Sequence, residues 1–272
     1  MVKNRLIFTL LSDNGNYMLS RNFSLQKVGD LNWLREHYNF DAIAYSIDEL
    51  ILLNVAREDK NFKQFSENIM ELGKQCFIPI VAGGGIRKLE DAYLLMNSGA
   101  DKLVVNSPVT TDPALVKALV NIFGSQCIVA SIDYFVTQDK TEVYISNGSK
   151  ATGMTVEQAI EKAQGLGCGE IYLTSMDNDG TGEGYDLETI KKASSFSKVP
   201  IIVSGGAGKY GHLAEGIVHG GVTASATANL FNFMADGLSE ARDVMKQRGI
   251  EMASWEIILS KENGLIEKDK VY

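Results

Sequence analysis

Short apolar segments alternate with longer amphipathic ones along almost the whole chain, and this alternation constrains the fold more than any other feature. Eight short segments are expected to form strands: Leu6–Leu11, Ile43–Val55, Ile78–Val81, Lys102–Asn106, Cys127–Ile132, Glu170–Thr174, Ile201–Ser204 and Thr223–Thr227. Helical periodicity is found in Lys60–Lys74, Leu89–Ser98, Pro113–Phe123, Thr155–Leu166, Leu187–Phe196, Gly211–His219 and Leu238–Gly249. Strands that alternate with helices predict a parallel sheet. Eight such units in 272 residues predict a closed (β/α)8 TIM barrel.

The chain also contains an internal repeat. The segment Ile78–Lys88 matches Val199–Lys209 at an offset of 121 residues, and Gly99 matches Gly220 at the same offset. This period is far longer than that of a solenoid repeat, and it predicts two half-barrels of four βα units each. No Pro- or Ser-rich linker divides the chain. We therefore expect one barrel domain over residues 1–250, followed by a polar extension over residues 251–272 that could be helical.

Charge and composition exclude several classes of function. The net charge of −8 argues against general binding to nucleic acid or to an anionic membrane. The three cysteines and three histidines lack the spacing of a metal site, so we expect neither a metal nor another cofactor. The first apolar run is short and lacks a cleavage signal, and no segment reaches transmembrane length. Widely spaced free thiols suit a reducing compartment, and we expect a cytoplasmic protein.

Two glycine-rich turns follow predicted strands and are candidate phosphate sites. Gly83-Gly84-Gly85 follows one strand, and Gly205-Gly206 follows its repeat. Glycine allows a close approach of backbone N–H groups to an anion. Barrels commonly bind phosphate in the loops after strands 7 and 8, and the repeat predicts an equivalent site in the other half. The alternative is that these glycines only form tight turns.

Two aspartates follow strands at the end where barrel enzymes carry their catalytic groups. Asp133 follows one apolar run, and Asp179 lies in Asp177–Thr181 after another. Both could serve as a general acid or base, although aspartate also forms turns. Two long loops, Ser12–Lys27 and Phe135–Thr152, are expected on the same face and would cover a substrate. The second loop contains a hairpin-like turn in Tyr144–Gly148.

Four charged residues, Arg5, Glu49, Lys102 and Glu170, stand at the beginnings of predicted strands. From the residues alone, the simpler interpretation is that they are solvated strand entrances.

Several motifs together resemble the cyclase subunit of imidazole glycerol phosphate synthase, a family of histidine biosynthesis. They are Gly83–Arg87, Gly99–Lys102, Asn106-Ser107, Phe123–Asp133, Lys150–Gly153, Glu170–Asp186, Ser204–Lys209 and Phe231–Phe233. The resemblance extends to about Ile250. It implies a (β/α)8 barrel that receives ammonia from a glutaminase partner docked at its lower end. The ammonia passes through the barrel to the upper end, where it enters a bis-phosphorylated substrate.

The resemblance also implies roles for individual residues. Asp133 matches one of two catalytic aspartates, and Asp179 matches an aspartate of the substrate site. With the glycines named above, the phosphate sites would comprise Gly84, Gly85, Asn106 and Ser107 in one half and Gly180, Gly205, Gly206, Ala228 and Asn229 in the other. Asn229 stands where a serine is usual. Arg5, Glu49, Lys102 and Glu170 match a charged ring that gates ammonia entry, and Asp101 matches an acidic residue that faces the glutaminase.

Three family positions are altered, all at the upper end. Leu11 replaces the second catalytic aspartate, Leu19 replaces a substrate-holding lysine, and Asn54 replaces an aspartate. Leucine cannot transfer a proton, and the loss of a general acid–base group costs about 10²–10⁴-fold in rate. The ammonia-admitting end, in contrast, retains all four charged identities, which favours the functional interpretation of the ring.

This combination is similar to the paralogous copy of the subunit found in surface-polysaccharide gene clusters. Such a copy is expected to pass ammonia from a glutaminase to a sugar amidotransferase, which converts an acetamido group on a nucleotide-linked sugar to an acetamidino group in lipopolysaccharide biosynthesis. The upper loops would then hold a phosphorylated small molecule or a partner's loop. Two alternatives stay open: an active cyclase (a lyase) of histidine biosynthesis, and a non-catalytic scaffold that only stabilises a glutaminase.

Overall fold

The parallel strands close into a barrel. The structure is a computed structural model that describes residues 3–38, 40–58, 60–74, 76–137, 140–253, 256–259 and 266–269. The barrel strands are β1 (Arg5–Asp13), β4 (Glu49–Asn54), β5 (Ile80–Gly83), β6 (Lys102–Val105), β7 (Ile128–Thr137), β10 (Glu170–Ser175), β11 (Ile201–Ser204) and β12 (Ala224–Thr227). Each pairs in parallel with the next, and β12 pairs with β1. The predicted TIM barrel is confirmed.

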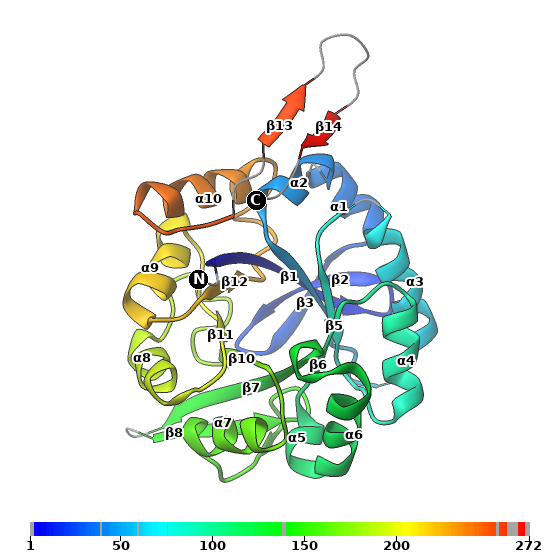
Figure 1. Ribbon diagram of the computed structural model, residues 1–272, viewed down its shortest axis with the longest axis vertical. Coiled ribbons are helices and arrows are strands. Elements are labelled where there is room, and N and C mark those ends of the chain that lie inside the picture. The colour runs from blue at the N-terminus through cyan, green and yellow to red at the C-terminus, as the bar shows by residue number, and fades with distance from the viewer. Residues whose placement is uncertain are drawn as a thin grey trace.

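Helices surround the barrel (Figure 1). They are α1 (Leu31–His37), α2 (Phe40–Ser46), α3 (Phe62–Gly73), α4 (Leu89–Asn97), α5 (Ser107–Thr111), α6 (Pro113–Phe123), α7 (Val156–Gly165), α8 (Leu187–Phe196), α9 (Tyr210–Gly220) and α10 (Gly237–Gln247), with a 3-10 turn at Ser125–Cys127. Local sequence sets several of the starts. The side chains of Asn61, Thr155 and Asp186 each accept a hydrogen bond from a first-turn N–H of α3, α7 and α8, respectively.

Two separate apolar layers follow from the alternation of side chains along each strand. The inner layer fills the barrel and consists of Ile7, Ile51, Val81, Val104, Val129, Tyr172, Ile202, Ala224 and Ala226. The outer layer lies between strands and helices and includes Leu6, Phe8 and Leu10 of β1. On β1, Arg5 precedes Ile7 by two positions and Leu11 follows it by four, so all three share the inward face. The strand pattern therefore places a charged group below the inner layer and an apolar one above it.

A buried ion pair fastens the last helix to the lower end of the barrel. The guanidinium of Arg242 on α10 donates to both carboxylate oxygens of Asp48, at 2.8 and 3.0 Å, and also to the carbonyl oxygen of Ser46 at 3.3 Å. Asp48 accepts a further hydrogen bond from the N–H of Leu6 at 2.8 Å. This network connects α10, β1 and the turn before β4.

Four sequence predictions need correction. Residues 43–46 of the predicted strand Ile43–Val55 belong to helix α2, and β4 begins only at Glu49. The predicted long loop Ser12–Lys27 is a hairpin of β2 (Asn16–Arg21) and β3 (Ser24–Gly29).

The second predicted loop also forms strands, because β7 extends to Thr137 and pairs with β8 (Lys140–Ile145), which pairs with β9 (Lys150–Ala151). The turn expected within Tyr144–Gly148 is present, with Ser146 and Asn147 at φ of 56° and 57°. In the C-terminal extension, β13 (Glu256–Leu259) pairs antiparallel with β14 (Ile266–Asp269), so these residues are not helical.

The internal repeat reappears in the backbone. Gly84 and Gly85 after β5 have φ of 97° and 99°, and Gly205 and Gly206 after β11 have φ of 90° and 110°. A Cβ on Gly84 would lie 2.2 Å from the carbonyl oxygen of Asn54, and a Cβ on Gly205 would lie 2.4 Å from that of Ser175. Both turns therefore press against the end of the neighbouring strand, and glycine is required in both.

Candidate functional site

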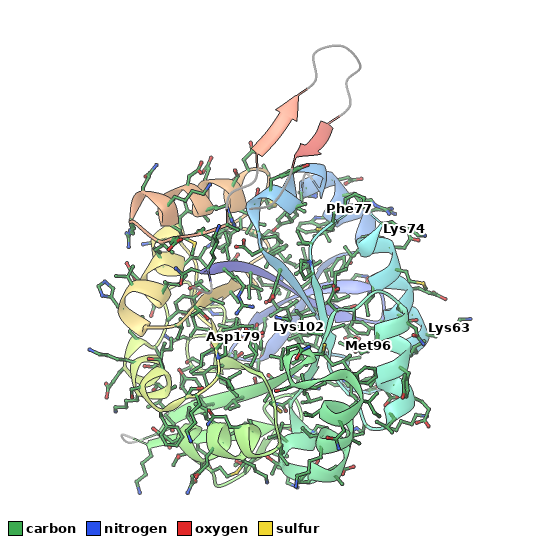
Figure 2. The ribbon with its side chains drawn as sticks, in the orientation of Figure 1. Lys63, Lys74, Phe77, Met96, Lys102 and Asp179 are labelled. Carbon is green, nitrogen blue, oxygen red and sulfur yellow. The ribbon has the colours of Figure 1, made fainter. Side chains whose placement is uncertain are left out.

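A closed ring of ion pairs spans the lower end of the barrel. Arg5 of β1 donates to Glu49 of β4 at 2.9 Å and to Glu170 of β10. Lys102 of β6 completes the ring with contacts of 2.7 Å to Glu49 and 3.0 Å to Glu170. Figure 2 shows Lys102 near the centre of the barrel, whereas Lys63 projects from the surrounding helices. The structure thus brings together all four residues predicted to form the gate.

The ring is mostly buried, and its charges depend on one another. The carboxylate side chains of Glu49 and Glu170 are 7% and 6% exposed. Burial alone lowers the pKa of Lys102, but the two carboxylates outweigh burial and raise it. The pKa of Arg5 is raised by the same balance. The two carboxylates therefore hold Arg5 and Lys102 in their charged forms, and a small molecule entering from below must separate at least one ion pair.

Asp101, the predicted partner-facing residue, lies exposed beside this ring. One of its carboxylate oxygens accepts a hydrogen bond from the N–H of Ile80 at 2.8 Å, which holds the side chain at the start of β5.

Above the ring, a cluster of three hydroxyl groups lies at the apolar inner layer. The Tyr172 hydroxyl lies 3.2 Å from the hydroxyl of Thr9 and donates to that of Ser204 at 2.9 Å. An apolar interior favours neutral ammonia over the ammonium ion, because burying an unpaired charge is costly.

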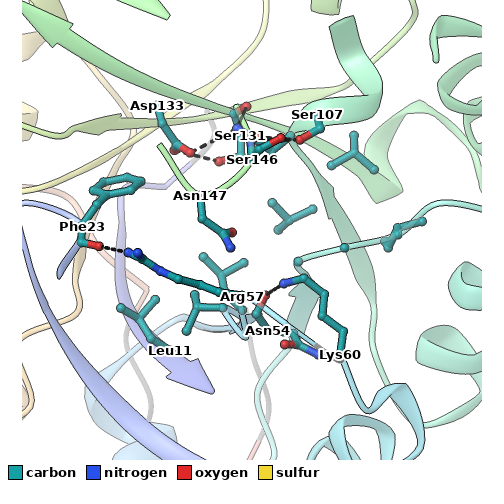
Figure 3. Close-up of a pocket in the computed structure, with 18 of the residues that line it drawn as sticks. Leu11, Phe23, Asn54, Arg57, Lys60, Ser107, Ser131, Asp133, Ser146 and Asn147 are labelled. Carbon is teal, nitrogen blue, oxygen red and sulfur yellow. Dashed lines mark hydrogen bonds between the residues drawn. The ribbon is translucent and has the colours of Figure 1, made fainter. Parts of the chain in front are cut away.

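A cavity of about 630 Å³ occupies the upper end of the barrel (Figure 3). Asp133 of β7 lines it and accepts hydrogen bonds from Asn106 at 3.1 Å and from the Ser131 hydroxyl at 3.3 Å. Burial raises the pKa of Asp133 to about 7, and the nearby charge of Asp179 acts in the same direction. A carboxyl group with this pKa can both accept and donate a proton near neutral pH.

Asp179, the other predicted acid–base residue, is held by the first hairpin. Its carboxylate accepts hydrogen bonds from the Ser20 hydroxyl and from the N–H of Phe23 at 3.0 Å. Phe23 has a φ of 62° and Asn22 a φ of 48°, a conformation that is strained for a bulky side chain. Burial raises the pKa of Asp179, while these two hydrogen bonds oppose the shift. In this structure Asp179 fastens the β2–β3 hairpin over the barrel.

The two predicted phosphate sites differ in size. Gly84, Gly85, Asn106 and Ser107 all line the large cavity. Gly180, Gly205, Gly206, Ala228 and Asn229 line a space of only about 20 Å³, together with Leu19 and Ser20 of the hairpin. A Cβ on Gly180 would lie 2.2 Å from the carbonyl oxygen of Ser20, so the hairpin rests directly on this second site. The hairpin therefore narrows this second site, which is far smaller than the large cavity.

The altered family positions have local structural explanations. Leu11 pairs in register with Leu53 of β4 and lines the cavity. Figure 3 places Leu11 across the cavity from Asp133. The buried side chain of Asn54 accepts a hydrogen bond from the N–H of Ala56 at 3.2 Å, which serves the turn after β4. Leu19 lines only the small second site.

Three basic residues at the cavity were missed from the sequence. Arg57 and Lys60 follow β4, Arg87 follows β5, and all three line the cavity. Lys60 was predicted to begin a helix, whereas α3 starts at Phe62. The available signal was a pair of basic residues just after a strand's C-terminal end, in a loop of the catalytic face.

Two kinds of feature are absent from the described parts of the chain. No three His, Cys, Asp or Glu side chains among those residues gather in a way that could hold a metal ion. No helix in that set has both the length and the apolar character needed to cross a membrane.

Comparisons with known proteins agree with this architecture. The family described as histidine biosynthesis protein matches residues 36–234. A protein of Parasynechococcus marenigrum, named for subunit hisF2 of imidazole glycerol phosphate synthase, is 39% identical over 261 residues, which cover 96% of this chain and 97% of that protein. The HisF subunit of the same synthase from Hyphomonas neptunium is 37% identical over 250 residues, covering 92% and 98%. The HisF subunit from Streptococcus mutans is 35% identical over 255 residues, covering 93% and 100%.

Proposed function

The chain belongs to the histidine biosynthesis family as a HisF-type barrel. From this premise we propose that it conducts ammonia without performing the cyclisation that the resemblance to the cyclase subunit implies. In this proposal a glutaminase docks at the lower end, beside Asp101 and the ion-pair ring. Ammonia enters through the ring and reaches the upper cavity. It is then used to convert an acetamido group on a nucleotide-linked sugar to an acetamidino group, as a step of lipopolysaccharide biosynthesis.

One contrast carries the proposal: the lower end has all four charged residues of the ring, whereas the upper end lacks one of the two catalytic aspartates that the resemblance implies. The four ring residues form every ion pair that a closed gate requires. Across the upper cavity, Asp133 faces Leu11, where the family resemblance implies a second catalytic carboxylate. Asp179 also lines the cavity, but it is bonded to the first hairpin. A cyclase that needs two proton-transferring groups would lack one of them.

The second phosphate site supports the same conclusion. A substrate with a phosphate at each end requires both glycine sites at once. Here the β2–β3 hairpin rests on Gly180, and the space behind it holds about 20 Å³. Leu19 adds an apolar side chain where a positive charge would be needed to hold substrate. The arrangement therefore favours a ligand that is anchored at one end only.

The remaining upper residues can still assist a transfer of ammonia. Ammonia leaving the apolar interior passes the Tyr172 hydroxyl and arrives beside Asp133. With a pKa of about 7, Asp133 can accept the proton that the nitrogen loses when it attacks the acetamido carbon, whose oxygen leaves as water. The acceptor is a separate sugar amidotransferase seated at the cavity mouth, and the barrel supplies a path closed to bulk water.

The same Asp133 is the observation that favours the alternative function, an active cyclase of histidine biosynthesis. Its pKa, its bonds to Asn106 and Ser131, and the open first glycine site are all compatible with acid–base chemistry. A non-catalytic scaffold for a glutaminase is a third candidate, and for such a scaffold the ring charges would be dispensable.

Deleting the gene in cells that carry it separates the three. Conduction of ammonia to a sugar predicts growth without histidine together with loss of the acetamidino group from the surface polysaccharide, read by mass spectrometry. Complementation with Lys102→Met should fail to restore that group, whereas Lys63→Met on the outer helix should restore it. A histidine requirement would contradict the proposal and support the cyclase. Full restoration by Lys102→Met would favour the scaffold.

A further inference from the structure

A cluster of cations at the rim of the upper cavity has no ionic partner among the described residues. Arg57 donates to the carbonyl oxygen of Phe23, and Lys60 donates to that of Asn54 at 2.8 Å. Arg87 lines the same cavity. None of the three forms a salt bridge within the parts of the chain that the structure describes. Figure 3 shows Arg57 and Lys60 directed into the cavity.

The ammonium group of Lys60 is held beside the first glycine turn. A Cβ on Gly85 would lie 2.3 Å from Cδ of Lys60, so only glycine lets this side chain cross the turn. Burial and the neighbouring charge of Arg87 lower the pKa of Lys60 to about 8, against a smaller opposing effect of Asp13. Two positive charges repel each other in a partly buried place. An anion bound between them would relieve this repulsion.

Acidic residues also line this cavity, but they are engaged elsewhere or stand apart. Asp91 accepts hydrogen bonds from the N–H groups of Arg87 and Lys88, at 2.9 and 3.2 Å. Asp133 and Asp179 are bonded to their own neighbours, as described above, and Glu58 is exposed at the rim. Within the described parts of the chain, none of these carboxylates forms an ion pair with the three cations.

We infer that the upper cavity binds the diphosphate group of a diphosphate ester, at the site formed by Arg57, Lys60, Arg87 and the Gly84–Gly85 turn. A single phosphate would be served by the glycine turn with Asn106 and Ser107. Three added cations match the larger charge of two adjacent phosphates, and arginine is well suited to their geometry. The second glycine site is much smaller and has the hairpin resting on it, which leaves this end as the anchor.

The organic part of such a ligand would extend into the rest of the cavity. Leu11, Leu25, Leu53 and Phe23 offer an apolar wall, and Asn147 and Ser146 offer polar groups at the mouth. A nucleoside diphosphate sugar has this division between a compact charged centre and larger uncharged ends. The inference deepens the proposed function and rests on it for the identity of the sugar, but the binding test below does not involve ammonia.

Binding of simple probes to the full chain tests the inference by titration calorimetry. Inorganic pyrophosphate and uridine diphosphate should bind at least about tenfold tighter than orthophosphate, since one additional charge-assisted contact contributes about that factor. Fructose 1,6-bisphosphate, whose phosphates are far apart, should bind no better than orthophosphate. Lys60→Gln and Arg87→Gln should each weaken pyrophosphate binding by about tenfold, and Lys63→Gln should leave it unchanged.

Contradicting outcomes are equally specific. Equal affinity for orthophosphate and pyrophosphate would overturn the diphosphate assignment, and tighter binding of fructose 1,6-bisphosphate would instead indicate a ligand with separated phosphates. A loss in Lys63→Gln as large as in Lys60→Gln would mean general charge attraction only. Thermal melts of each variant identify any loss that reflects unfolding. If pyrophosphate fails to bind while the gene deletion still removes the acetamidino group, the diphosphate site is refuted and the ammonia path is not.

Discussion

Replacing Asp133 with asparagine should make the protein more stable, although the change removes a charged group from the centre of the upper cavity. In the folded chain the pKa of Asp133 is raised from 3.8 to about 7, chiefly by burial. Above pH 7 the folded state must therefore hold a carboxylate that it disfavours. Between pH 4 and 7 the folded state binds more protons than the unfolded state, so the contribution of Asp133 to stability falls as pH rises through this window.

The expected magnitude follows from that shift. About three pKa units at about 1.4 kcal/mol each amount to about 4 kcal/mol of destabilisation at pH 8. Asparagine keeps the shape without the charge, but it weakens the hydrogen bonds with Asn106 and Ser131, at a cost of about 1 kcal/mol each. The net gain for Asp133→Asn at pH 8 is about 2 kcal/mol, which raises Tm by roughly 5 °C in a chain of this size.

Thermal or urea unfolding of both proteins at pH 5, 6, 7 and 8 measures this effect. The difference in stability between Asp133→Asn and wild type should grow from pH 5 to pH 7 and then level off. The matched control is Asp112→Asn, which alters a capping aspartate on α6 outside the cavity. A variant that is less stable than wild type at pH 8, or a difference that does not change with pH, would refute the reasoning. A buried carboxyl group that lowers the stability of the folded protein is typical of a functional site, where activity is retained at a cost in stability.

Three other changes have defined outcomes. Arg242→Ala leaves Asp48 buried without its partner and should cost about 3–5 kcal/mol in urea unfolding, and an effect below 1 kcal/mol would contradict the structural role of that pair. Gly180 has a φ of 70°, and a Cβ there would meet the carbonyl oxygen of Ser20. Gly180→Ala should therefore displace the first hairpin, seen as faster proteolytic cleavage within residues 16–29. Unchanged cleavage would argue against the contact between this turn and the hairpin. Lys102→Met should reduce the coupling of glutamine hydrolysis to ammonia delivery and release ammonia to solvent, whereas tight coupling would show that the ring is dispensable.

The barrel itself could be predicted because it follows from a pattern that repeats eight times. The prediction was wrong where a pattern was locally ambiguous. Ile43, Ala44 and Ile47 form an apolar run that suits a strand and a buried helix equally, and the run ends up in or beside α2. The strands within the two predicted long loops could not be predicted, because their pairing depends on turns such as Asn22-Phe23. The positive φ of that turn is stabilised by Asp179, which is distant in the sequence.

The site was only partly predictable for a similar reason. Arg5 and Glu170 are 165 positions apart, and no local pattern indicates that they touch; the resemblance to a known family supplied that expectation. Arg57, Lys60 and Arg87 come from two different loops, and they form a cluster only when β4 and β5 lie side by side. Asp179 both lines the cavity and holds the first hairpin by hydrogen bonds to Ser20 and Phe23, and the second role depends on the fold of that hairpin.

The most direct test of the central claim is the cyclisation reaction itself. The purified chain would be given the bis-phosphorylated histidine-pathway intermediate and an ammonium salt, with no glutaminase present, beside the variant Leu11→Asp. The account predicts turnover by the wild type at least about 100-fold below that of an ordinary cyclase, because a general acid–base group is missing, and a measurable gain in Leu11→Asp. Turnover by the wild type at the rate of an ordinary cyclase would contradict the account and assign the protein to histidine synthesis.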